Sequence, residues 1–364
     1  MPLQLRGASG RKVGVRVLIL QTAFLGDVVL TLPLIARLRQ HFPQAQIEVM
    51  TVPAHAAVLQ QQPGIDTVMT YDKHGQQRGI RGFCTMVRQI RARRYALVVT
   101  PHRSLRTALL VAGSGAPRRI GFARWSTRWA YTATVPRPVQ GHEVERNLQL
   151  LTALGLEAAA STVRLTLCVA PAARQRAAEY FVRGGTGPED VVVGLIPGSQ
   201  WGTKRWPAER FAALIDHLAS MSALRCALFG GPQDRPLAEA ILAKCTAPVL
   251  DLIGQTTLPE LPAYLERCAV VVSNDTGPMH IAAAVGRPIV ALFGPTTIAM
   301  GFAPYGVPWE EVSVSLACRP CHAHGPQRCP LSHWRCMREL SVARVAMSVQ
   351  RLLALRPVTD EERA

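Results

Sequence analysis

The chain has 364 residues, of which 48% are hydrophobic, so it is long and apolar enough to build two domain cores. Its formal net charge is +17, which excludes an electrostatically neutral surface and favours an anionic partner. No apolar run approaches the roughly 20 residues that cross a bilayer, and the apolar stretch after the basic N-terminus is too short for a signal peptide, so we expect a cytoplasmic protein.

The first half of the chain alternates between short apolar runs and helical patterns. An apolar run at 15–20 predicts a strand, and apolar spacing over 28–42 predicts a helix that Pro33 either kinks or begins. Further strands are expected at 47–52, 67–71, 97–100 and 119–122, and further helices at 79–93, 102–112 and 142–154. Gly155 suits the end of the last helix.

The pattern weakens over 156–190 and then resumes. A strand at 163–167 and a helix near 171–183 are expected before the glycine-rich segment 184–188, which we interpret as a linker. Beyond it we expect strands at 191–196, 227–229, 249–253, 269–273 and 289–293, and helices that begin at Trp206-Pro207 or lie near 234–244, 258–267 and 278–285.

Strands that alternate with helices predict an α/β fold with two doubly wound, Rossmann-like parallel-sheet domains that face an interdomain cleft. We expect a flexible leader at 1–14, an N-terminal domain at 15–185 and a C-terminal domain at 186–364. The second domain holds a cysteine-rich loop at 318–336 and ends in a helix that we expect to pack back on the first domain.

The positive charge is concentrated in the first half. Residues 1–150 hold 21 basic and 6 acidic groups, whereas the other 214 residues hold 20 and 18. Three partners fit this asymmetry: nucleic acid, an anionic membrane face, or a phosphorylated substrate. An arginine-rich composition alone would explain the number of arginines but not their confinement to one half.

Two loops in the second half follow strands and precede helices. In the segment 273–280, Thr276, Gly277 and the next backbone N–H groups can bind an anion at a helix N-terminus, and Asp275 can accept hydrogen bonds from sugar hydroxyls. The alternative is ordinary helix capping, with His280 packed against a neighbour.

The second of these loops, at 197–207, combines glycines with the Ser199 hydroxyl and the Lys204 ammonium, which can neutralise a diphosphate. It lacks the Gly-Lys-Ser/Thr order of a Walker A loop. The alternative is a surface loop with solvated charges, although two tryptophans in one loop weigh against it.

A carboxylate follows the first predicted strand. Asp27, next to Gly26, would lie at the mouth of the cleft and could act as a general base on an acceptor hydroxyl. An aspartate that only caps a helix is the alternative.

Nine cysteines are present. Four of them form a cluster interleaved with histidines, whose spacing is compatible with a structural zinc site or with a reduced cluster in a tight loop: Cys318, Cys321, Cys329 and Cys336. The others lie in apolar settings and are expected to be buried, reduced thiols: Cys84, Cys168, Cys226, Cys245 and Cys268.

Taken in order, these motifs resemble the lipopolysaccharide heptosyltransferases, GT-B enzymes of glycosyltransferase family 9. The runs at 17–33, 197–207 and 274–280 with 293–296 resemble the family's opening, donor loop and signature, and the tail at 318–337 looks like the heptosyltransferase II branch. The resemblance covers about residues 15–350.

The resemblance implies an N-terminal acceptor domain and a C-terminal nucleotide-sugar domain. Asp27 would be the base, Lys204 would hold the diphosphate, and Thr256 would lie in the loop that lines the adenine pocket. The remaining implied donor contacts are Ser199, Asp275, Thr276, Gly277 and His280. Four arginines beside segments expected to face the cleft are candidates for gripping acceptor phosphates or carboxylates: Arg78, Arg81, Arg103 and Arg106.

The resemblance implies that the chain transfers heptose from ADP-L-glycero-D-manno-heptose to a heptosyl-Kdo-lipid A acceptor, with inversion at the anomeric carbon and without a metal or other cofactor. The resemblance therefore implies a monomer at the inner-membrane surface, with an anionic glycolipid as the partner of the basic half. A heptosyltransferase I, a nucleotide-sugar epimerase and a nucleic-acid-binding protein are the alternatives. The basic half weighs against an epimerase, and no nucleic-acid-binding signature is found.

Overall fold

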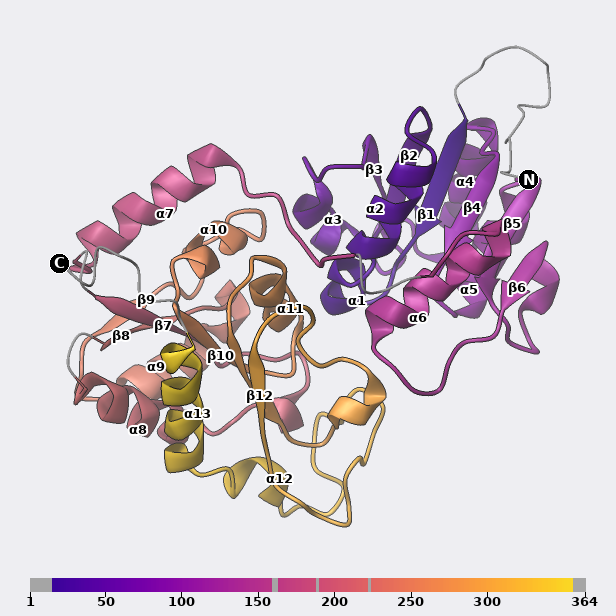
Figure 1. Cartoon of the computed structure of the whole chain (residues 1–364). Helices are drawn as coiled ribbons and strands as arrows, with labels where there is room; N and C mark the ends of the chain where they lie inside the picture. The colour runs from indigo at the N-terminus through magenta and orange to yellow at the C-terminus, as the bar shows by residue number, and fades with distance from the viewer. Residues whose placement is uncertain (1–14, 159–162, 188–189, 222–223, 356–364) are drawn as a thin grey trace. The chain divides into compact units, whose positions relative to one another are not determined.

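The computed structural model describes residues 15–158, 163–187, 190–221 and 224–355 (Figure 1). The chain divides into two compact units, Met1–Cys168 and Val169–Ala364. Each contains a six-stranded parallel sheet, which confirms the expected α/β class. The leader expected at 1–14 and Pro188 of the expected linker lie outside the described residues.

The first unit has the strand order β3-β2-β1-β4-β5-β6. Its strands are β1 Arg16–Leu20, β2 Gln46–Thr51, β3 Thr67–Thr70, β4 Leu97–Thr100, β5 Arg118–Phe122 and β6 Ala133–Val135. Its helices are α1 Leu25–Val29, α2 Leu32–His41, α3 Pro53–Leu59, α4 Gly79–Ala92, α5 Leu105–Gly113 and α6 Glu143–Gln149, with 3₁₀ turns η1 Arg128–Ala130 and η2 Leu150–Leu154.

The central strand β1 is apolar on both faces because helices cover the sheet on both sides. Val17, Leu18, Ile19 and Leu20 are all fully buried. On one face Leu18 and Leu20 pack with α4 and α5, which contact each other, while α2 packs with α6. The apolar run read from the sequence is therefore the middle of a covered sheet.

Pro33 begins a helix and does not kink one. It occupies the first turn of α2, and a separate short helix, α1, holds the residues before it. Gly155 has the left-handed backbone (φ 73°) expected where η2 ends. Both turns follow from residue types that the sequence makes visible.

The second unit repeats this design with the strand order β12-β11-β10-β7-β8-β9. Its strands are β7 Val191–Ile196, β8 Leu224–Leu228, β9 Val249–Asp251, β10 Val270–Asn274, β11 Ile289–Phe293 and β12 Trp309–Ser313. Its helices are α7 Pro171–Arg183, α8 Ala208–Ala219, α9 Arg235–Leu242, α10 Leu261–Glu266, α11 Gly277–Ala284, α12 Arg335–Arg338 and α13 Val342–Ala354.

The domain boundary expected at 185/186 is wrong, because the division falls after Cys168 and α7 belongs to the second unit. Tyr180 of α7 packs edge-on against Tyr264 of α10, with ring centroids 5.9 Å apart. Arg174 pairs with Glu266 at 2.7 Å. The glycine-rich segment taken for a linker instead joins α7 to β7 inside one unit.

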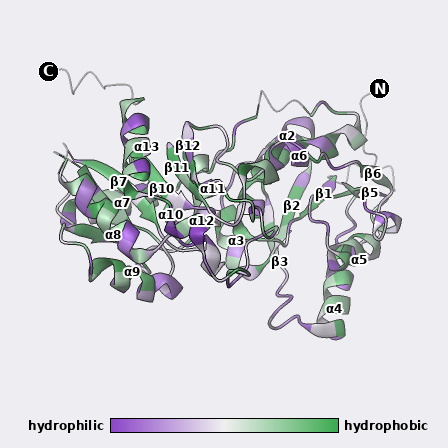
Figure 2. Ribbon diagram, turned by 90° about the horizontal axis from the view of Figure 1, so that it is seen from below, coloured by the Kyte–Doolittle hydropathy of each residue, from purple (hydrophilic) through white to green (hydrophobic). Residues whose placement is uncertain are grey.

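The buried face of the C-terminal helix α13 packs within the second unit, and the expected contact of this helix with the first domain stays a prediction. Val345, Val349 and Leu352 are buried in the core that α13 shares with α8 and the sheet. Figure 2 shows hydrophilic and hydrophobic segments alternating along α13, as a helix with one buried face requires.

The segment expected as a strand at 163–167 is extended but pairs with no strand of the described chain. Val163, Leu165 and Leu167 are buried while the residues between them are exposed, which produced the strand-like alternation. Gln62 takes the place of a partner strand near Cys168, whose N–H donates to Gln62 Oε1 at 2.7 Å.

Two of the five cysteines expected to be buried are exposed, namely Cys84 and Cys168. Cys84 lies on the outer face of α4, and Cys168 lies on the exposed side of the alternating segment. Cys226 and Cys268 are buried and Cys245 is half-buried. Among the described residues, no helix is both long enough and apolar enough to cross a membrane.

Candidate functional site

Both sheets have the strand order of a doubly wound fold, in which the chain runs outward from a central strand and then returns to its other side. The loops that follow the two neighbouring central strands diverge and leave a crevice at the carboxyl edge of the sheet. These strands are β1 and β4 in the first unit and β7 and β10 in the second. Most of the predicted site residues follow one of these four strands.

Asp27 lies in α1, immediately after β1. Its Oδ2 accepts a hydrogen bond from the backbone N–H of Phe24 at 3.2 Å, so the carboxylate caps the helix that contains it. The Thr31 hydroxyl donates to the Asp27 carbonyl oxygen at 2.7 Å. Asp27 thus does cap the helix, as the alternative interpretation of this residue expected.

The electrostatics of Asp27 go beyond those of an ordinary cap. Burial, and then the negative charge of Glu143, raise the pKa of Asp27 from 3.8 to about 7, against the opposing hydrogen bond from Phe24 and the charge of Arg137. Glu143 is itself buried and pairs with Arg137 and Arg146. A carboxylate with this pKa is half ionised near neutral pH, where a general base is most effective.

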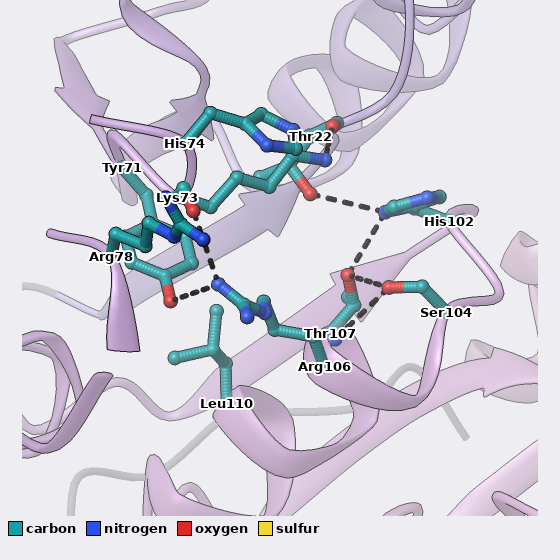
Figure 3. Close-up of a pocket in the computed structure, with 10 residues that line it drawn as sticks. All are labelled: Thr22, Tyr71, Lys73, His74, Arg78, His102, Ser104, Arg106, Thr107 and Leu110. Atoms are coloured by element: carbon teal, nitrogen blue, oxygen red, sulfur yellow. Dashed lines mark hydrogen bonds between the residues drawn. The ribbon is translucent and has the colours of Figure 1, made fainter. Parts of the chain in front are cut away.

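A basic pocket of about 370 Å³ opens between the loops after β1, β3 and β4 and helix α5 (Figure 3). Five of the residues that line it are basic or imidazole side chains: Lys73, His74, Arg78, His102 and Arg106. The others are Thr22, Tyr71, Ser104, Thr107 and Leu110, so no acidic residue lies among the ten described lining residues. The pocket is suited to an anion.

Hydrogen bonds fix the cations of this pocket. Lys73 Nζ donates to the Thr22 carbonyl oxygen at 2.7 Å, and Arg106 donates to the Tyr71 hydroxyl at 3.3 Å. His102 Nδ1 lies 3.1 Å from the Thr22 hydroxyl and 2.9 Å from that of Thr107. The loops after β1 and β4 are therefore joined through His102.

The cations of the pocket oppose each other. Burial, followed by the charge of Lys73, lowers the pKa of His102 to about 4. Burial and the charge of Arg106 lower the pKa of Lys73. A bound anion would relieve this repulsion, so the pocket favours a negatively charged ligand over a neutral one.

The four predicted acceptor arginines do not form one group. Arg78 and Arg106 line the basic pocket, whereas Arg81 and Arg103 are exposed and are not among its lining residues. Arg103 precedes α5, which begins at Leu105 and not at the expected position 102, because Ser104 caps it by accepting from the Thr107 N–H at 3.1 Å.

In the second unit, the loops after β7 and β10 meet through a buried ion pair. Lys204 Nζ lies 2.5 Å from Asp275 Oδ2, and both side chains are at most 10% exposed. The Thr296 hydroxyl donates to the same oxygen at 2.7 Å. Since a buried charge is costly without a partner, each of these residues depends on the other.

Asn274 joins the same two loops through backbone groups. Its Nδ2 donates to the Pro197 carbonyl oxygen at 2.7 Å, and its Oδ1 accepts from the Trp206 N–H at 3.2 Å. Gly198 has no side chain because a Cβ there would lie 2.6 Å from the Asp234 carboxylate oxygens. The loop at 197–207 is therefore held against the end of β10.

The other predicted donor residues differ in how they are placed relative to the Lys204–Asp275 pair. Thr276 is the N-cap residue of α11, Gly277 is its first residue, and His280 is buried in its second turn. Ser199 is buried, and its hydroxyl accepts weakly from the Trp201 N–H at 3.4 Å. Thr256 lies in the loop after β9, the outermost strand on one side of the sheet, and among the described residues no hydrogen bond links it to the pair.

The cysteine-rich loop at 318–336 covers the donor loop. Gln327 accepts from the Gly202 N–H at 3.2 Å and donates to the Gln200 carbonyl at 3.0 Å, and the Trp334 indole donates to the Thr203 carbonyl at 2.9 Å. The His324 ring stacks on that of Trp201, with centroids 6.4 Å apart. The loop thus forms part of the wall of the Lys204 site.

The cysteines themselves do not form a metal centre in the part of the chain that is described, where no three His, Cys, Asp or Glu side chains converge on one point. Cys318 Sγ lies 3.9 Å from His333 Nε2, Cys336 is buried and Cys321 is exposed. Arg319, between two of them, donates to the carbonyl oxygens of Phe293 and Thr296 and so supports Thr296.

Several residues of these sites were not singled out from the sequence. Thr22 and His102 directly follow predicted strands, but only the strand order reveals that these strands are neighbours. Thr296 and Arg319 lie in the segments 293–296 and 318–337, which resemble family motifs, but the sequence suggested no role for either residue. Lys73 follows a strand in a loop that had no motif of its own.

Comparisons with known proteins agree with this arrangement. The model of glycosyltransferase family 9 (heptosyltransferase) matches residues 83–334. Lipopolysaccharide heptosyltransferase 3 of Escherichia coli is 32% identical over 282 residues, which cover 75% of this chain and 82% of that protein. Other relatives are type 2 heptosyltransferases, including that of E. coli K12.

Two solved structures are similar over the whole chain. A family 9 glycosyl transferase of Veillonella parvula has a TM-score of 0.83 at 25% identity, covering 95% of this chain and 99% of that one. E. coli ADP-heptose LPS heptosyltransferase II has a TM-score of 0.75 at 22% identity, covering 96% and 100%. The second comparison concerns the fold alone.

Proposed function

Because the chain belongs to glycosyltransferase family 9, the heptosyltransferases, we propose that it transfers heptose from ADP-L-glycero-D-manno-heptose to a heptosyl-Kdo-lipid A acceptor during synthesis of the lipopolysaccharide core. The observation that carries the proposal is Asp27, a carboxylate at the carboxyl edge of the first sheet whose pKa is raised to about 7. Because the chain belongs to this family, we no longer consider the epimerase and nucleic-acid-binding alternatives.

In the proposed reaction, Asp27 accepts the proton of an acceptor hydroxyl. The hydroxyl oxygen forms the new bond to the anomeric carbon, and the bond from that carbon to the diphosphate breaks with its electron pair on ADP. Displacement from the opposite side inverts the anomeric centre. A base with a pKa near the working pH combines a useful ionised fraction with enough basicity to take the proton.

The second unit would bind the donor. Lys204 offers two further N–H bonds beyond the one it gives Asp275, and these would stabilise the negative charge that develops on the departing ADP. The hydrogen bonds from Lys204 and Thr296 to the Asp275 carboxylate both end on Oδ2, so Oδ1 would accept from a donor hydroxyl. Ser199, Thr256, Thr276, Gly277 and His280 are proposed as the remaining donor contacts.

The first unit would bind the acceptor. The basic pocket is suited to a phosphate or carboxylate of the acceptor core, with Arg78, Arg106 and Lys73 as the cations. Arg81 and Arg103 would contribute only a longer-range attraction. We further propose that the protein works as a monomer at the inner face of the inner membrane, without a metal or other cofactor and without nucleic acid.

The test is to incubate the purified chain with ADP-heptose and with heptosyl-Kdo-lipid A, and to measure both ADP release and the mass of the acceptor. We expect ADP release to depend on the acceptor and the acceptor to gain one heptosyl residue. ADP release at the same rate without acceptor would make the protein a hydrolase and contradict the proposal.

The type 3 and type 2 relatives suggest two positions for the added heptose. Offering acceptors with one and with two heptoses in parallel distinguishes them, since the preferred acceptor has the higher kcat/KM. A preference for an acceptor with no heptose would instead identify a heptosyltransferase I.

A further inference from the structure

Four large apolar side chains are exposed on the first unit beside each other in the fold. Trp125 is 90% exposed and Trp129 is 53% exposed, and both lie in the loop between β5 and β6. Leu105 is 56% and Leu109 is 41% exposed, and they lie one turn apart on the outer face of α5. We call these four residues the tryptophan patch.

The structure holds the loop against the helix. The turn η1, which contains Trp129, packs on α5. The Arg124 guanidinium donates to the Arg103 carbonyl at 3.3 Å, which ties the start of the loop to the segment before α5. The Trp129 indole donates to the Ser126 carbonyl at 3.0 Å, so the loop is folded upon itself. Hydrogen bonds and packing therefore hold the loop that carries the two tryptophans in a defined conformation.

Arginines flank this apolar surface in the sequence. Arg103 lies two positions before Leu105, and Arg124 and Arg128 directly precede Trp125 and Trp129; all three arginines are exposed. Within the described parts of the chain, none of the three has an ion pair with an acidic side chain. Three cations beside exposed indoles, without an acidic partner in the described chain, favour an external anionic surface.

We propose that the tryptophan patch and its three flanking arginines dock the first unit onto a lipid bilayer that contains anionic headgroups. Tryptophan is enriched at membrane interfaces because its ring is apolar while its N–H is polar. Arginines beside it would lie at the level of the phosphates, where each basic residue adds roughly 1 kcal/mol to binding. The charges and the apolar side chains then favour the same occupant.

The patch also lies near the proposed base. The Thr22 hydroxyl, in the loop that leads to Asp27, lies 3.1 Å from Nδ1 of His102, the residue before Arg103. Arg137 and Glu143 act electrostatically on both Arg103 and Asp27. Docking here would bring Asp27 close to the bilayer surface. The inference rests on the proposed function for the presence of a membrane, and it adds which surface of the chain docks there.

The experiment measures binding of the full chain to vesicles. One set contains phosphatidylcholine alone and the other contains added phosphatidylglycerol, and both are examined by co-sedimentation and by quenching of tryptophan fluorescence with brominated lipid. We expect the wild type to bind the anionic vesicles more tightly. We expect the double variant Trp125→Ser/Trp129→Ser to bind them at least about tenfold more weakly, which corresponds to about 1.4 kcal/mol.

Val139→Ser is the matched control, because Val139 is 88% exposed in the same unit but outside the patch. It should bind vesicles as the wild type does. Arg124→Ser/Arg128→Ser should reduce binding to the anionic vesicles and leave the weak binding to neutral ones unchanged. Thermal unfolding establishes that each variant folds, which is expected since the replaced side chains are exposed.

Equal binding of the tryptophan double variant and the wild type would overturn the proposal, as would failure of the wild type to bind either vesicle. A double variant with a smaller mass in solution than the wild type would show that the patch joins copies of the chain, which also overturns it. Transfer of heptose to an acceptor without lipid chains should be unchanged in the double variant. That assay tests the proposed function separately.

Discussion

Lys204 Nζ donates a hydrogen bond to Asp275 Oδ2 at 2.5 Å and so joins two loops that are 71 residues apart in the sequence. Both side chains are buried. The pair holds the ammonium where the loops after the two central strands of the second sheet meet. Its removal therefore affects both the proposed chemistry and the stability of the second unit.

Lys204→Met should lower kcat by about 10²–10³-fold, as expected when one stabilising donor is lost from a developing negative charge. It should also destabilise the protein by about 3–5 kcal/mol, because Asp275 stays buried without its partner. Steady-state kinetics and urea unfolding measure the two effects. Lys244→Met, on an exposed lysine of the same unit, is the control. Unchanged kinetics in Lys204→Met would remove Lys204 from the donor site.

Asp27→Asn should lower kcat by about 10²–10⁴-fold, since an amide cannot accept the proton of the acceptor hydroxyl. Its carbonyl oxygen can still accept the Phe24 N–H, so α1 should stay folded and the affinity for ADP-heptose should be retained. Asp216→Asn is a matched control, because Asp216 also accepts backbone N–H bonds but lies outside both candidate sites. Near-normal kcat with a lower Tm would show that Asp27 is only a cap.

The rate should depend on pH through Asp27. Because burial raises its pKa to about 7, kcat/KM should fall about tenfold per pH unit well below pH 7, where the base is protonated, and level off above it. The acidic limb should be measured with a saturating donor. An acidic limb that begins near pH 4 would mean that another group sets the rate.

The stability of the folded protein should change with pH in the opposite direction to the rate. Between pH 3.8 and about 7 the unfolded chain has released the Asp27 proton while the folded chain retains it, so the free energy of unfolding falls as pH rises through this window. Asp27→Asn removes this dependence, and its stability relative to wild type should rise from pH 4 to pH 7. Urea unfolding at several pH values measures the difference, and a constant difference would contradict the raised pKa.

Arg78→Glu/Arg106→Glu should raise the KM of the acceptor about tenfold or more, because two cations of the basic pocket become anions. The KM of the donor should be unchanged. Arg88→Glu places the same charge on the exposed side of α4, outside the pocket, and serves as the control. A rise in the donor KM would show that the pocket belongs to the donor.

Chelation should leave kcat unchanged. The proposed chemistry needs no metal, and no three candidate ligands converge within the described residues. Treatment with EDTA followed by assay, with and without added zinc, measures this. Immediate loss of activity that zinc restores would assign a metal to the cysteine-rich loop, which borders the Lys204 site.

The sequence predicted the alternation of strands and helices because apolar period and turn residues are local signals. Pro33 and Gly155 marked their turns correctly. The domain boundary predicted near 185 was wrong because a pair of glycines resembles a linker. The packing of Tyr180 on Tyr264, which places α7 in the second unit, cannot be read from the sequence. The strand at 163–167 failed because alternation reports burial and not pairing.

The candidate sites were predictable to the extent that they depended on motifs. Asp27, Lys204 and Asp275 followed strands in recognisable segments. The basic pocket was predictable only through Arg78 and Arg106, because Lys73 follows β3 and His102 follows β4, and only the sheet topology shows that the loops after these strands meet. The raised pKa of Asp27 could not be predicted either, because it depends on burial and on Glu143, which lies 116 positions further along the chain.

The hydrogen bond from Trp334 to Thr203 has a consequence for the order in which the protein is made. The sheet and helices described in the first unit are complete by residue 154, so a ribosome has released all of them long before the chain ends. In the second unit, the donor loop at 197–207 has to wait for residues 327 and 334, and its sheet for β12. A nascent chain stopped before the cysteine-rich loop would therefore carry the basic pocket of the first unit but only an unfinished loop at 197–207.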